Sequence, residues 1–122
     1  METITHPIHY FAVAGIKINM RSLDLKFRKE KIEYIQTVVC NHYGISVEEL
    51  FKKDRHPNIV AARYILMFVM KKRMGMSLVS IGKHFGKDHS TVIHAVKKVE
   101  CILDPKYSYP EKADFDTILT SF

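Results

Sequence analysis

The sequence predicts an all-α domain of five to six helices built around a helix-turn-helix, preceded by a short irregular or hairpin N-terminal extension. Two observations predict this fold class: apolar residues recur at helical spacing, and capping residues flank one tight turn. At 122 residues the chain is long enough for one domain with its own core. We therefore expect an extension over residues 1–24 and a folded domain over residues 25–122.

The N-terminal extension shows weak strand alternation around Ala12, and Ala14-Gly15 is suited to a turn, so a small hairpin is expected. A helix is predicted from Phe27 to Tyr43, with Gly44 as its stop. Ser46 and Glu49 have the spacing of a capping box, which predicts a short helix over residues 47–51.

The next helix is predicted from Pro57 to Met74, because proline suits the first helical turn and Gly75 suits the end. Its residues are apolar nearly all round, which predicts the central buried helix. A last helix is predicted over residues 113–121, after a loop that contains two prolines. Its apolar side consists of Phe115, Ile118, Leu119 and Phe122.

The helix-turn-helix lies between these two helices, over residues 76–103. Ser77 is a good N-cap for a helix that ends at Phe85, Gly86 can adopt the left-handed conformation, and Asp88 can cap the second helix. Two helices joined by so short a turn must cross at a steep angle.

The second helix has an inward apolar face predicted from Val92, Val96, Val99 and Leu103. Its opposite face is polar and basic, and residues 88–91 project from its N-terminus. A helix of this kind can place its first turn against base edges in a major groove while lysines further along reach phosphates.

The net charge of +6 is unevenly distributed. Residues 52–98 carry eleven bases and two acids, an excess of +9, whereas residues 1–51 are balanced and residues 99–122 are acidic. A localised basic surface implies a polyanionic partner. The alternative is a solubilising charged face, which more usually mixes the two signs.

Other classes lack support in the sequence. Cys40 and Cys101 have no CxxC partner, the histidines are not spaced to share a helical face, and no GxxxxGK[ST] loop occurs. No apolar run approaches the roughly 20 residues that span a bilayer, and the stretch around Ala12 lacks the basic region of a signal peptide. We expect a cytoplasmic protein that is not an enzyme and has no metal, cofactor, nucleotide or membrane partner.

The stretch Asp88-His89-Ser90-Thr91-Val92-Ile93-His94-Ala95 resembles the signature of the DNA-binding C-terminal domain, domain IV, of the bacterial replication initiator DnaA. The resemblance covers roughly residues 32–103, and residues 113–122 look like that domain's closing helix. It implies a Trp-repressor-like helix-turn-helix fold in a stand-alone homologue. It also implies sequence-specific binding of double-stranded DNA at DnaA-box-like sites, which would regulate or mark replication origins or promoters.

The resemblance also implies individual roles. Base contacts are implied for Asp88, His89 and Ser90 in the major groove, for Val79 beside them, and for Arg55 in the minor groove. Phosphate contacts are implied for Arg63, Lys71, Lys87, Thr91 and Lys98. The run at residues 71–73 would equally complement the negative end of its helix.

Two departures from the family pattern bear on the preferred DNA sequence rather than on the fold. Gly86-Lys87 stands where the family usually has Gly-Gly-Arg, and residues 60–63 lack an extra arginine and proline. Two other functions remain open. One is a protein-interaction adaptor, with a protein partner or self-association through residues 1–20; the other is a nucleic-acid clamp indifferent to sequence.

Overall fold

The computed structural model describes residues 12–13, 16–17 and 20–122, with side chains from residue 27 onward. Contacts divide the chain into two compact units, residues 1–33 and residues 34–122. In the first unit, β1 (Ala12–Val13) and β2 (Ile16–Lys17) pair antiparallel, which agrees with the predicted hairpin. The other residues assigned to that hairpin lie outside the described residues, and the domain boundary at residue 24 stays a prediction.

The helix predicted from Phe27 is longer than expected. Helix α1 (Met20–Tyr43) begins at Met20 and ends, as predicted, before Gly44, whose φ of +67° suits a residue without a side chain. Its C-terminal half belongs to the second unit, where Ile35, Val39 and Cys40 are buried.

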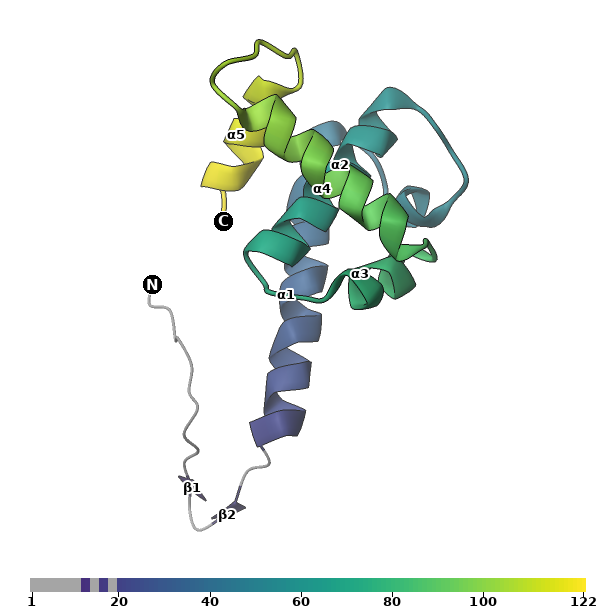
Figure 1. The fold of residues 1–122 in the computed structure, drawn as a ribbon. Coiled ribbons are helices and arrows are strands. Elements are labelled where there is room, and N and C mark those ends of the chain that lie inside the picture. The colour runs from purple at the N-terminus through teal and green to yellow at the C-terminus, as the bar shows by residue number, and fades with distance from the viewer. Residues whose placement is uncertain (1–11, 14–15, 18–19) are drawn as a thin grey trace. The chain divides into compact units, whose positions relative to one another are not determined.

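The second unit contains only helices and loops among its described elements, which confirms the predicted all-α class. After α1 come the 3-10 helix η1 (Glu48–Phe51), α2 (Pro57–Lys72), α3 (Leu78–Phe85), α4 (His89–Leu103) and α5 (Lys112–Thr120). Figure 1 shows α4 crossing α2, with α3 near its N-terminal end and α5 near its C-terminal end.

Helix α2 is the centre of this unit, as its apolar sequence predicted. It packs against η1, α3 and α4. Burying one such aliphatic side chain contributes about 1.5–3 kcal/mol, so this helix supplies much of the hydrophobic stabilisation. Its buried apolar residues are Ile59, Ala62, Ile65, Leu66, Met67, Val69 and Met70.

Helix α2 ends at Lys72, two residues before the predicted end at Met74. Gly75 has a φ of +68°, which reverses the chain so that the Met76 N–H donates to the Met70 carbonyl over 3.0 Å. That closing bond satisfies a carbonyl of the last turn, and it is the physical reason why the helix stops early.

The helix-turn-helix forms as predicted. The Ser77 hydroxyl accepts from the Ser80 N–H at 3.1 Å, and Gly86 ends α3 with a φ of +65°. Gly82 is packed against the turn itself. A Cβ at Gly82 would lie 2.6 Å from the Lys87 carbonyl oxygen, and the Lys87 N–H donates back to the Gly82 carbonyl at 2.8 Å. The two helices can approach this closely only because residue 82 lacks a side chain.

The inward face of α4 differs from the prediction at one residue. Leu103 is only partly buried, because the face also takes in Ala95 and lies nearer to Ile102. Its buried residues are Val92, Ala95, Val96, Val99 and Ile102.

Helix α5 closes the unit against α4, within one residue of the predicted bounds. Phe115 and Ile118 are buried, and Phe122 meets Tyr34 edge-on with ring centroids 6.5 Å apart. Arg73, at the end of α2, donates to the Leu119 carbonyl at 2.9 Å. This bond ties the C-terminal helix to the central one.

Candidate nucleic-acid interface

The first turn of α4 is a capped and exposed helix N-terminus. Asp88 Oδ2 accepts from the Ser90 N–H at 3.4 Å and from the Ser90 hydroxyl, so one carboxylate oxygen forms the cap. These hydrogen bonds from Ser90 lower the pKa of Asp88 below its usual 3.8, with a smaller contribution from His89. The carboxylate is therefore ionised at neutral pH, and Asp88 Oδ1 has no part in the cap.

The other predicted base-contacting residues of the motif are also exposed. The side chain of His89 is 57% exposed, with its Nδ1 atom 3.4 Å from Asp88 Oδ1. Val79, on α3, is 55% exposed although it is apolar. Ser90 and Thr91 are exposed beside His89. The close packing at Gly82 fixes the helix that carries His89 against the helix that carries Val79, so this surface is held by backbone contacts.

The basic loop, residues 52–55, leaves η1 and enters α2. Its start is fixed in two ways. Ser46 and Glu49 form the predicted capping box, with the Ser46 N–H donating to Glu49 Oε1 at 2.8 Å and the Glu49 N–H donating to the Ser46 hydroxyl at 3.3 Å. Phe51 stacks on Phe85 with ring centroids 5.6 Å apart, which ties the start of the loop to α3.

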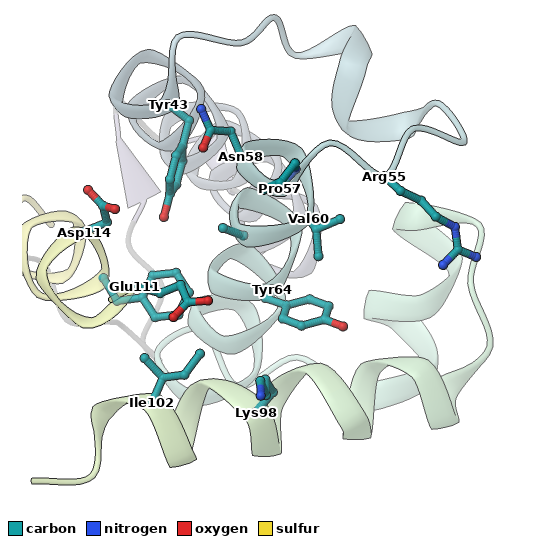
Figure 2. A pocket seen from close by; sticks show the side chains of 12 residues that line it. Tyr43, Arg55, Pro57, Asn58, Val60, Tyr64, Lys98, Ile102, Glu111 and Asp114 are labelled. Carbon is teal, nitrogen blue, oxygen red and sulfur yellow. The ribbon is translucent and has the colours of Figure 1, made fainter. Parts of the chain in front are cut away.

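Arg55 is the last residue of the basic loop, and it is exposed. Figure 2 shows its side chain extending from the entrance of α2, while Lys98 lies on α4. The Lys98 ammonium lies 5.3 Å from the centroid of the Tyr109 ring, a cation–π contact that restrains its side chain. Tyr109 could not be predicted as a partner of Lys98 from the sequence, because a loop residue eleven positions away has no periodic relation to a helical one.

Arg63 is placed differently from the sequence expectation of a phosphate contact. It is only 8% exposed, and its guanidinium donates to backbone carbonyls of η1 and the basic loop rather than extending into solvent. The charge of Arg63 therefore lies beneath the basic loop. The sequence motif identifies Arg63, but it does not predict that the side chain points inward.

The three basic residues at 71–73 make different contacts. Lys72 pairs with Glu100 on α4 at 2.8 Å, and Arg73 binds the end of α5. Both therefore act within the protein, alongside the favourable charge they place at the end of α2. Lys71 is partly buried, and Lys87 is exposed in the turn of the helix-turn-helix.

A cavity of about 350 Å³ lies between the start of α2, α4 and α5. Figure 2 shows Tyr43, Glu111 and Asp114 on one side and Lys98 on α4. The Tyr43 hydroxyl and Glu111 Oε1 are buried without a hydrogen-bond partner in the described structure. Burial, with the nearby carboxylates of Asp114 and Glu111, raises the pKa of Tyr43 above its usual 10. This acidic side would repel phosphate, so it limits the basic surface.

In the described part of the chain, no group of three or more histidine, cysteine or carboxylate side chains could hold a metal ion. None of the helices in that part is both long enough and apolar enough to cross a bilayer.

Comparison with known families decides the relationship. The sequence model described as the bacterial dnaA protein helix-turn-helix matches residues 32–99, more than half of the chain. The chain belongs to this DnaA helix-turn-helix family. Membership indicates DNA binding, and the matched range contains the basic loop, α2, α3 and most of α4.

The relatives with curated names include the chromosomal replication initiator proteins DnaA of Thermoanaerobacter sp. and Thermoanaerobacter pseudethanolicus. Each is 40% identical over 74 residues, which is 61% of this chain and 17% of the relative. The chain thus corresponds to less than a fifth of those DnaA proteins, and the match confirms the resemblance to the DnaA C-terminal domain.

Proposed function

We propose that this chain binds double-stranded DNA sequence-specifically, at sites that resemble DnaA boxes, and so marks or regulates replication origins or promoters. The observation that carries the proposal is the exposed first turn of α4, which a tightly packed helix-turn-helix holds in place. The basic loop is joined to this motif, because Phe51, at its start, stacks on Phe85 of α3. Side chains at a helix N-terminus in this motif reach base edges in the major groove.

Within this function, Asp88, His89 and Ser90 read bases in the major groove. Asp88 Oδ1, which lies near His89 Nδ1 but takes no part in the cap, suits the exocyclic amine of cytosine. His89 presents a flat ring, and Val79 offers an apolar surface to a base beside it. Arg55 reaches the minor groove from the basic loop.

Phosphates are held by Lys71, Lys87, Thr91 and Lys98. Thr91 lies in the first turn of α4, where N–H groups and the helix dipole favour an anion. Arg63 is left out of this set, because its guanidinium is occupied by carbonyls of the protein.

Equilibrium binding to a DnaA-box duplex and to a scrambled duplex of the same composition, at matched salt, tests the proposal. Preference for the box duplex supports it. Equal affinity for both would show a clamp indifferent to sequence, and no binding to either would favour a protein-interaction adaptor.

A further inference from the structure

Four backbone carbonyls surround the guanidinium of Arg63. The Nε–H donates to the Leu50 carbonyl and an Nη1–H to the Asp54 carbonyl, each at 2.7 Å. The Nη2 group donates to the carbonyls of Glu49, at 3.3 Å, and Lys52. These four acceptors span the path from η1 through the basic loop, so one side chain of α2 holds the whole segment.

Only an arginine can make this set of contacts. Its planar fork carries five N–H donors in fixed directions, four of which are used by these carbonyls. A lysine would place one ammonium at a single point and could not reach all four carbonyls in this geometry. The arrangement is therefore specific to the shape of the side chain at position 63 rather than to its charge.

The exposed Arg55 is held on both sides through this network. The Asp54 carbonyl, bound by Arg63, belongs to the peptide unit that leads into Arg55. The following peptide unit, between Arg55 and His56, is held because the His56 N–H donates to Asp54 Oδ1 at 2.9 Å. His56 in turn caps α2, with its Nδ1 accepting from the Asn58 N–H at 3.3 Å.

We infer that Arg63 and Asp54 are positioning residues for DNA recognition: together they fix the two peptide units that flank Arg55. The basic loop then presents the Arg55 side chain to DNA in one orientation. The carboxylate of Asp54 would repel a phosphate backbone, so Asp54 cannot favour DNA binding by electrostatic attraction. Any favourable effect of Asp54 on DNA recognition must come from positioning. This inference rests on the proposed function, since Arg55 needs a DNA site to read.

Opposite results are expected if Arg63 and Asp54 act directly through their charge and if they position the basic loop. If Arg63 were a phosphate contact, lysine would substitute for it, and its effect would add to that of Arg55→Ala. If Asp54 acted only through its charge, Asp54→Asn and Asp54→Ala would strengthen binding to any DNA equally. A positioning role predicts instead that Asp54→Asn, which keeps an acceptor oxygen, differs from Asp54→Ala, which does not.

The experiment measures the preference of the full chain for a DnaA-box duplex over a scrambled duplex, in the wild type and in these variants. We expect Asp54→Ala to lower the preference about tenfold, the scale of one lost base contact, while Asp54→Asn keeps it within about twofold. We expect Arg55→Ala to lower the preference about tenfold in the wild type but less than about twofold in Arg63→Lys.

The controls keep the two proposals separate. If the wild type prefers neither duplex, the proposed function fails. If the wild type has a preference that Asp54→Ala and Asp54→Asn change equally, or that Arg55→Ala reduces equally in both backgrounds, the positioning inference alone is overturned. Thermal unfolding identifies loss of fold in Arg63→Lys, and Asp54→Ala still tests the inference then, because Asp54 is exposed and its removal leaves the buried fork intact.

Discussion

Gly82→Ala tests the packing of the helix-turn-helix, because two known effects act on it in opposite directions. Gly82 lies inside α3, where alanine is favoured over glycine by about 1 kcal/mol from helix propensity alone. The new Cβ, however, would lie 2.6 Å from the Lys87 carbonyl oxygen, and within 3.6 Å of atoms of Asp88 and His89. The obstacle is backbone, which cannot rotate away as a side chain would.

Overpacking of this kind costs about 1–3 kcal/mol, and subtracting the propensity gain of about 1 kcal/mol leaves an expected net loss of up to about 2 kcal/mol. For a unit of this size, each kcal/mol corresponds to about 4–8 °C in melting temperature. Calorimetry of Gly82→Ala beside Lys83→Ala, an exposed change on the same helix, measures the difference. A Gly82→Ala protein more stable than the wild type would show that the turn is not packed against α3 as described.

Three further predictions concern charge and the extension. The slope of log affinity against log salt should be about −2.7 to −3.6, from three or four cations (Lys71, Lys87, Lys98 and Arg55) with Arg63 excluded; a slope near zero in a salt titration would argue against phosphate contacts. Burial lowers the pKa of His84 below its usual 6.5. As the pH falls below 6.5, His84 therefore binds a proton in the unfolded chain before it does so in the folded protein. The free energy of unfolding is unaffected by His84 above pH 6.5 and decreases as the pH falls through the folded-state pKa. The melting temperature should fall on acidification below pH 6.5, and His84→Gln should flatten that part of the profile; an unchanged profile would mean that His84 does not cause it. Deleting residues 1–20 should leave DNA preference intact and alter oligomeric state in light scattering, whereas lost preference in a folded truncation would reveal a DNA-contacting arm.

Local signals were enough to predict most helix ends. Ser77, Gly86 and Asp88 act through hydrogen bonds to residues at most four positions away, so their effect can be read from spacing. The central position of α2 could also be predicted, because a helix that is apolar all round has no face for solvent. The start of α1 was predicted at Phe27, seven residues after its observed start at Met20.

The site was predicted less completely than the fold. Exposure of Asp88, His89 and Val79 follows from their place at a helix end or on a polar face. The inward orientation of Arg63 depends on where the carbonyls of residues 49–54 lie after the chain has folded, and no sequence spacing encodes that. Only the role of Asp54 has a signal in the sequence. In Asp54-Arg55-His56, followed by a proline, the aspartate side chain is suited to accept a hydrogen bond from the backbone N–H of His56.

His89→Ala tests most directly whether the first turn of α4 reads bases. The measurement is the affinity of the folded variant for the DnaA-box and scrambled duplexes, with Lys98→Ala as the matched control on the same helix. We expect His89→Ala to lose about 1–3 kcal/mol on the box duplex and little on the scrambled one, whereas Lys98→Ala weakens both alike and makes the salt slope shallower by about one unit. Full retention of the box preference by His89→Ala, with an unchanged melting temperature, would contradict base reading by this helix.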